Sequence, residues 1–147
     1  MTDTPLPLRK TWMATLAKAA PARLAALLPH LPDHAILRQP EIGAVMVRGR
    51  IGATGAPFNL GEMTVTRASL RLATGEVGHA WVQGRDKAHA LRAAVVDALM
   101  QTGDAPRLAA EVLQPLEAEV ARQRDSRAGK AAATKVDFFT MVRGEDK

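Results

Sequence analysis

Cysteine is absent from the 147-residue chain, and so is tyrosine. Without cysteine, the chain has no disulfide scaffold, no thiolate metal site and no cysteine nucleophile. Serine is scarce, and neither Ser69 nor Ser126 lies in the Gly-x-Ser-x-Gly pattern of a hydrolase nucleophile. The sequence also lacks a Walker A loop and a Gly-x-Gly-x-x-Gly motif that follows a strand. An enzyme that acts alone is therefore poorly supported.

Long apolar runs are missing too, and none approaches the ~18 residues that a membrane-spanning helix needs. The first residues lack the basic and apolar regions of a signal peptide, so we expect a cytoplasmic protein. Aromatic residues make up only 3% of the chain and hydrophobic residues 47%, which predicts an aliphatic core. The length fits one domain over residues 1–147.

His30 and His34 are four residues apart, which is the spacing of a zinc-binding helix face. Pro32 interrupts any such helix, and no glutamate accompanies the pair. We therefore expect neither a metal nor a cofactor in this chain.

The formal net charge is +5, and arginine supplies 14 of the 20 basic residues. Because a guanidinium forks onto carboxylates and phosphates, this bias indicates an anionic partner or an acidic protein surface. A proteome rich in arginine and alanine would give the same composition, so the charge leaves both explanations open.

Hydrophobic periodicity predicts helices, then strands, then helices. Trp12 and Leu16 have helical spacing within 9–20, and a second helix is expected to begin at Pro21. The alternation of side chains changes phase near Thr66, which predicts a β-bulge there. Strands, separated by glycine-containing turns, are predicted over 34–39, 43–51, 58–72 and 76–83.

Asp86 is expected to cap a helix over about 87–101. A further helical pattern follows, and Pro115 is expected to kink or restart it. Residues 121–135 are polar and rich in alanine, as in a solvated helix or a linker. This order predicts an α+β fold with an antiparallel β meander between N-terminal and C-terminal helices. The apolar stripe of the helix after Asp86 should consist of Ala88, Leu91, Val95 and Ala98.

A strand-to-helix junction is expected at Gln83-Gly84-Arg85-Asp86-Lys87. Free N–H groups at a helix N-terminus attract anions, and Arg85 and Lys87 add positive charge. Ordinary capping by Asp86, with Gly84 making the turn, is the interpretation that the spacing favours. Arginines also alternate along the predicted strands, as a basic sheet surface or as the solvated side of a one-sided sheet, at Arg48, Arg50, Arg67 and Arg71.

Two phenylalanines, Phe138 and Phe139, lie within ten residues of the chain end, followed by Met141 and Arg143. Such a cluster either joins the chain's own sheet as an edge strand or inserts into a partner. Adjacent strand residues point to opposite faces, so burying both phenylalanines requires cover on two sides. We predict that a segment at about 134–144 docks onto a partner.

The chain contains, in order, Trp12-Met13, Thr66-Arg-Ala-Ser-Leu-Arg-Leu, Trp81-Val-Gln-Gly-Arg-Asp-Lys-Ala-His89-Ala, Asp97-Ala-Leu-Met-Gln101 and Val136-Asp-Phe-Phe-Thr-Met-Val-Arg-Gly144. In order and spacing these runs resemble the PhnG family, the G subunit of the carbon–phosphorus lyase core complex. The resemblance covers nearly the whole chain.

The resemblance implies a non-catalytic subunit that works with the H, I and J subunits, with I as the expected direct contact and the L protein as a functional partner. That system transfers the ribose triphosphate of ATP to an alkylphosphonate and releases adenine. Its iron–sulfur radical step belongs to the J subunit, and a chain without cysteine cannot hold such a cluster. No residue of this chain is assigned to catalysis. The candidates for contact with an anion or a subunit are Arg67, Arg85, Lys87 and His89.

Two other classes stay open. One is an independent enzyme, for which turnover of ATP by the pure chain would be the evidence. The other is a small basic module that binds nucleic acid or another anionic partner, for which a steep salt dependence of DNA affinity would be the evidence. Against the second, few aromatic residues are available for base stacking and no nucleic-acid-binding motif is present.

Overall fold

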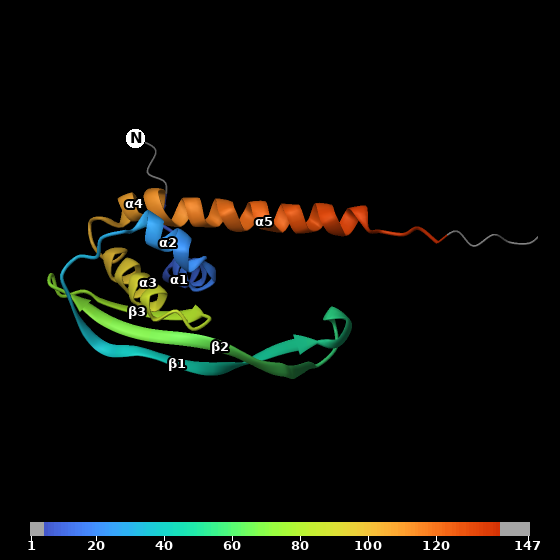
Figure 1. Ribbon diagram of the computed structural model, residues 1–147, viewed down its shortest axis with the longest axis horizontal. Helices are drawn as coiled ribbons and strands as arrows, with labels where there is room; N and C mark the ends of the chain where they lie inside the picture. Colours follow the sequence, from blue (N-terminus) through green and yellow to red (C-terminus); the bar gives the residue numbers. More distant parts are fainter. Residues whose placement is uncertain (1–4, 139–147) are drawn as a thin grey trace, which may run out of the picture.

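The computed structural model describes residues 5–138. Figure 1 shows helices packed on one side of a curved sheet, with two long projections that leave the core in the same direction. In chain order the elements are α1 (Arg9–Lys18), α2 (Pro21–Leu27), β1 (His34–Arg50), the 3-10 turn η1 (Ile51–Ala53), β2 (Pro57–Leu72), β3 (Val77–Gln83), α3 (Lys87–Leu99), α4 (Ala105–Leu108), the π-helical segment η2 (Ala109–Leu113) and α5 (Gln114–Ala133).

The three strands form one antiparallel sheet in the order β1-β2-β3, which confirms the predicted meander and the α+β class. Pairing between β2 and β3 ends where Val65 lies opposite Gln83. β1 and β2 stay paired beyond that point as far as Arg50 and Pro57. The sheet therefore has a three-stranded part against the helices and a two-stranded part that continues outward.

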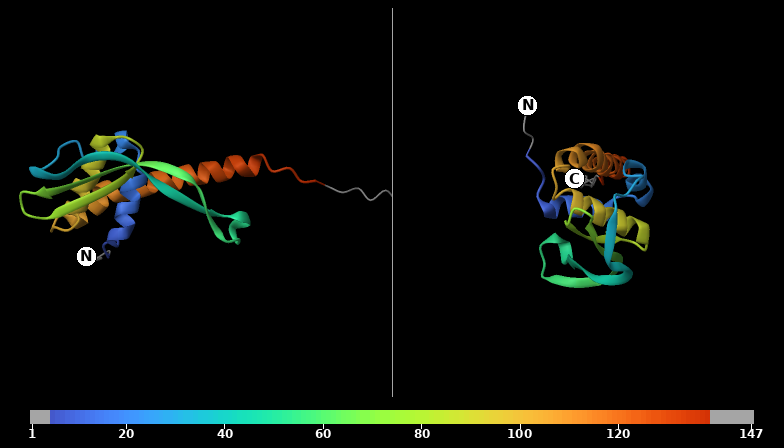
Figure 2. Two further views of the ribbon diagram at one scale, coloured as in Figure 1. Left: turned by 90° about the horizontal axis from the view of Figure 1, so that it is seen from below. Right: turned by 90° about the vertical axis from the view of Figure 1, so that its left-hand side faces the viewer.

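Helix α3 lies at the centre of the core, with the sheet on one side and the other helices on the other (Figure 2). Leu70 and Val82 of the sheet are fully buried there, as are Leu16, Leu24 and Leu108 from the surrounding helices. Each such side chain contributes about 1.5–3 kcal/mol relative to an exposed one. The predicted aliphatic core is confirmed.

The first strand differs from the prediction, because 34–39 and 43–51 belong to one strand, β1, that runs through Pro40. Proline lacks an N–H, and a strand tolerates it where that position faces away from the sheet. β1 is an edge strand, and Pro40 lies in the irregular stretch between Arg38 and Glu41, where the regular pairing with β2 is interrupted.

The bulge predicted at Thr66 is wrong, because β2 pairs regularly with β3 through that position. β1 carries extra residues between Ile36 and Arg38 and between Arg38 and Glu41, and β2 carries one between Asn59 and Gly61. The apparent change of phase has another cause. Met63 lies past the end of the helix-covered sheet, where both faces meet solvent and alternation no longer reports burial.

The apolar stripe of α3 was also predicted incorrectly in part. Val95 and Ala98 are buried, but Ala88 is exposed and Leu91 is only half-buried. Nine of the 13 residues are buried because the helix is covered on two sides. A single amphipathic stripe therefore does not describe it.

Pro115 restarts the last helix without breaking it. The backbone stays helical at the junctions of α4, η2 and α5, and the π-helical turns of η2 end just before Pro115. An α-helix would need the missing Pro115 N–H to bond the carbonyl of Glu111, so the hydrogen-bond pattern shifts there. Residues 121–133 are a solvated helix and not a linker. Within residues 5–138, no helix combines the length and apolar character needed to cross a membrane.

Candidate functional site

The junction between β3 and α3 turns at Gly84, whose φ of +94° lies in a region that favours glycine. Its carbonyl accepts a hydrogen bond from Thr66 Oγ1 at 2.8 Å. Asp86 then caps α3, because its Oδ1 accepts the backbone N–H of His89 at 2.9 Å. The observed turn and cap are those that the spacing favoured.

Arg85 and Lys87 lie on the surface beside this cap. In the part of the chain that the structure describes, neither forms a salt bridge. The N-terminus of α3 adds partial positive charge, and the Asp86 carboxylate offsets part of it. Two exposed cations at a helix start can bind a partner's carboxylate or a phosphate, and that role stays a prediction.

His89 is not a surface contact, contrary to the prediction. The residue is only 1% exposed, and its Nε2 lies 2.9 Å from the carbonyl oxygen of Leu16. The carbonyl can only accept, so Nε2 carries the proton. Nδ1 is buried without a partner among the described residues. Burial lowers the pKa of His89 below its ordinary value of 6.5, so the neutral ring joins α3 to α1.

The sheet face opposite the helices carries Arg67 and Trp81. The Arg67 guanidinium lies 5.6 Å from the centre of the Trp81 ring and 2.9 Å from the Glu41 carboxylate. The hydrogen bond from Arg67 lowers the pKa of Glu41. Trp81 is 50% exposed, and exposed tryptophan and arginine together are frequent anchors of protein interfaces. This open sheet face is the second candidate contact surface.

The four alternating arginines do not form one basic surface. Arg67 and Arg71 lie in the three-stranded part of the sheet. Arg48 and Arg50 lie at the far end of the two-stranded part, opposite Asn59 and Pro57 respectively. The alternation of side chains put each pair of arginines on one face of its own strand. It carried no information on how far the two-stranded part extends past the helices.

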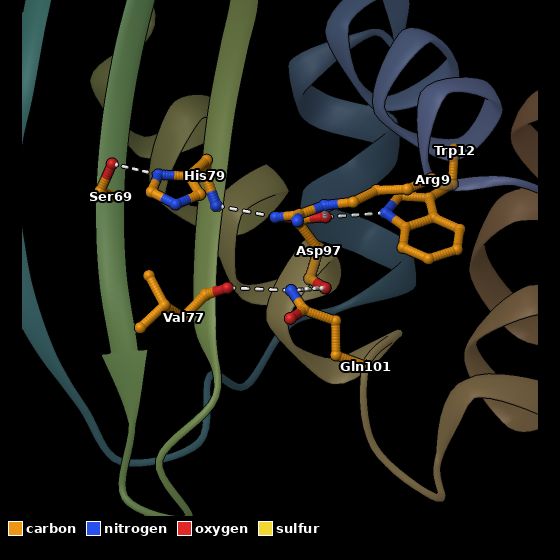
Figure 3. A network of polar contacts seen from close by, with 7 residues as sticks. All are labelled: Arg9, Trp12, Ser69, Val77, His79, Asp97 and Gln101. Carbon is orange, nitrogen blue, oxygen red and sulfur yellow. Dashed lines mark hydrogen bonds and ion pairs between the residues drawn. The ribbon is translucent and has the colours of Figure 1, made fainter.

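A network of hydrogen bonds links α1, α3 and β3 (Figure 3). The sequence analysis did not predict it. Its centre is Asp97, which is fully buried. The carboxylate accepts Arg9 Nε at 3.1 Å and Arg9 Nη2 at 2.7 Å. It also accepts Trp12 Nε1 at 2.8 Å and the backbone N–H of His79 at 2.9 Å. Four donors satisfy one carboxylate, so its role is structural.

Ser69, His79 and Asp97 lie close together but do not form a catalytic triad. Ser69 Oγ lies 2.8 Å from His79 Nδ1, whereas Asp97 binds the backbone of His79 and not its ring (Figure 3). A triad carboxylate must hold the imidazole itself in orientation. Over the described range 5–138, no cluster of three or more histidine, aspartate or glutamate side chains could hold a metal ion.

The predicted docking segment falls mostly beyond the described range. Phe138 is the last residue described and is 92% exposed. Phe139, Met141 and Arg143 lie outside the described residues, so the docking role assigned to them stays a prediction.

The Asp97 carboxylate is occupied by structural hydrogen bonds, and the exposed Arg67 and Trp81 are of the kind that anchors contacts between proteins. Residues 8–144 match the model of a family described as phosphonate metabolism protein PhnG. The chain is also 49% identical over 142 residues to the alpha-D-ribose 1-methylphosphonate 5-triphosphate synthase subunit PhnG of Rhizobium meliloti (strain 1021), across 94% of this chain and 90% of that protein. The chain belongs to the PhnG family, which confirms the resemblance seen in its sequence.

Proposed function

We propose that the chain is a non-catalytic subunit of an assembly that transfers ribose 5-triphosphate from ATP to an alkylphosphonate, in the breakdown of organic phosphonates. The observation that carries the proposal is the 49% identity, over nearly the whole chain, to a protein named as a subunit of such a synthase. In the reaction, the bond between ribose C1′ and adenine breaks and a phosphonate oxygen bonds to C1′. Adenine leaves with a proton.

The chemistry needs an acid for the leaving adenine and cations for the triphosphate. Asp97 is fully buried and bonded by four donors, and His89 is buried inside the core. Neither can reach a substrate without unfolding the core. Arg85 and Lys87 are accessible and can donate hydrogen bonds to an anion. These placements support a division in which partner subunits carry the catalytic groups.

The partners proposed are the H, I and J subunits, with I in direct contact and the L protein required for function. The iron–sulfur cluster is assigned to J. Co-expression of the tagged, full-length chain with H, I and J tests the association. We expect one complex containing all four polypeptides. The proposal fails if H, I and J assemble together while this chain elutes alone.

The role of the β3–α3 junction is tested by reversing one charge. Arg85→Glu should weaken adenine release by the assembled complex while leaving the thermal melt of the isolated chain unchanged, because the side chain is exposed. Asp86→Ala is the matched control for capping and should lower stability by about 1 kcal/mol. Full activity of Arg85→Glu would leave capping as the only role of the junction.

The C-terminal segment is tested by truncation after Lys135. We expect the shortened chain to melt as the full chain does, because residues 134–138 are exposed and outside the core. Its association with the other subunits should be weakened or lost, since each buried phenylalanine contributes about 1.5–3 kcal/mol. A truncated chain that itself unfolds would show instead that the segment belongs to its own sheet.

A further inference from the structure

The outer part of β1 and β2 forms an arm, residues 43–64, that projects beyond the core (Figures 1 and 2). β3 ends opposite Val65, so only two strands continue into it. Almost all its residues are exposed or half-buried within the described structure. A two-stranded ribbon on its own is at best marginally stable in water. A further surface packed against the arm would add to its stability.

The arm carries large apolar side chains that meet solvent. Ile51 at its tip is 76% exposed, Leu60 61%, Met46 58% and Phe58 41%. Single exposed apolar residues are ordinary, but four on one projecting ribbon are typical of a contact surface.

The second projection is the outer part of α5, residues 121–133, in which every residue is exposed. Leu116 is the only buried residue of α5, and the first turn of the outer part lines a shallow groove beside α1 with Ala121 and Arg124. The arm and the outer part of α5 leave the core in the same direction in both views (Figures 1 and 2). One partner placed on that side of the molecule can touch both.

Both projections are positively charged. The outer part of α5 has Asp125 as its one carboxylate against four cations, Arg122, Arg124, Arg127 and Lys130. The arm has Glu62 as its one carboxylate against two cations, Arg48 and Arg50. A second copy of the chain would present the same sign of charge, and like charges across an interface are unfavourable. The charges fit an acidic polypeptide.

We infer that the arm and the outer part of α5 together hold one partner subunit of different sequence, with an acidic surface and an apolar centre. The inference rests on the proposed function and adds to it the surface that binds. Apolar residues of the arm supply the buried anchors, and the cations of α5 fix the orientation of the partner and speed its encounter.

The test uses full-length variants co-expressed with the H, I and J subunits. Ile51→Ser with Leu60→Ser should weaken association at least about tenfold with little change in its salt dependence. Arg124→Glu with Arg127→Glu should weaken it to a similar degree and should also reduce its dependence on salt. All four side chains are exposed, so the melting temperature of the isolated chain should not change.

Matched controls lie away from both projections. Leu8 is 77% exposed, close to the 76% of Ile51, and Leu8→Ser should leave association unchanged. Arg107 is exposed on α4, away from both projections and from the Arg67–Trp81 face, and Arg107→Glu reverses one charge there, half the change made by the double variant. Equal weakening by the controls would overturn the inference, because it would show that overall hydrophobicity or net charge decides association.

The outcomes separate the two proposals. If the unmodified chain fails to join H, I and J, the proposed function itself fails. If it joins them but the arm and α5 variants join equally well, only the present inference is overturned. A dimeric mass of the isolated chain that the Ile51→Ser, Leu60→Ser variant abolishes would assign the arm to a second copy. Binding of the isolated chain to random-sequence DNA, lost in Arg124→Glu with Arg127→Glu, would assign α5 to nucleic acid. Either result contradicts the inference.

Discussion

Asp97 is the residue on which α1, α3 and β3 converge. Arg9 contributes little to its stabilisation, because its side chain is 46% exposed and solvent screens the pair. The Trp12 indole N–H and the His79 backbone N–H are more important, because each is a donor that loses water on folding.

Asp97→Ala should therefore lower the free energy of unfolding by about 2–4 kcal/mol, since it leaves those donors without an acceptor. Chemical denaturation of the isolated chain measures this. Asp125→Ala, an exposed carboxylate on α5, is the control and should change stability by less than about 0.5 kcal/mol. Equal stabilities of the two variants would refute the structural role of Asp97.

His89 makes the stability of the fold depend on pH. In the unfolded chain its pKa is the ordinary 6.5, and in the folded chain burial lowers it. Between these values the unfolded state binds more protons, so stability is fully present above 6.5 and declines as the pH falls through the folded pKa.

His89→Gln should reduce this decline, because the amide can still donate to the Leu16 carbonyl but does not titrate. The free energy of unfolding, measured between about pH 5 and pH 8, tests it. His30→Gln removes an exposed imidazole and is the matched control for the loss of one histidine. A slope unchanged by His89→Gln would mean that other groups cause the decline.

Single residues were predictable where local chemistry decides their place. Asp86 and Gly84 follow from a strand, a turn and a cap within five residues. Asp97 and His89 do not, because their partners in α1 are 85 and 73 residues away in the sequence. No local pattern in the sequence indicates that a helix will be covered on two of its faces.

The packing of β3 on α3 depends on Gly78. A Cβ at this position would collide with the backbone carbonyl of Ala94 and would lie 2.9 Å from the Ala98 Cβ. The absence of a side chain therefore sets the distance between the sheet and its central helix, which a larger residue would increase.

Gly78→Ala should lower the free energy of unfolding by about 1–3 kcal/mol, because the backbone of α3 must shift to make room. Gly43→Ala is the matched control, a strand glycine with nothing within 4 Å of a Cβ. It should be neutral or slightly stabilising. Thermal melts of the two variants decide, and a Gly78→Ala chain as stable as Gly43→Ala would contradict the described packing.

The order and kind of the elements could be predicted, since turns at glycine and proline and the two periodicities are local signals. The β-bulges of the sheet could not be placed from the sequence, and the one predicted at Thr66 is absent. Alternation of apolar and polar residues indicates the inward face of a strand only where that face is buried. The helices cover only part of the β1–β2 ribbon. The continuous helix through Pro115 was equally hidden, because a π-helical segment accommodates the missing N–H.

The molecule as a whole combines a helix-covered sheet with two projections that it does not bury (Figure 1). The sequence runs were sufficient to indicate the PhnG family, because those runs are specific and keep their order. They did not indicate the projections. The sequence of the arm has the pattern of ordinary strands, and the composition of the outer part of α5 fits a linker as well as a helix. Only the arrangement in space shows that both point the same way and lack cover.

The central claim is that this chain contributes to ribose 5-triphosphate transfer only within an assembly. Adenine release from ATP in the presence of methylphosphonate, measured with purified H, I, J and L proteins and with this chain added or omitted, tests it most directly. We predict no release by the chain alone, and release by the full set that falls to background when the chain is left out. Adenine release by the chain alone, or undiminished release without it, would contradict the account.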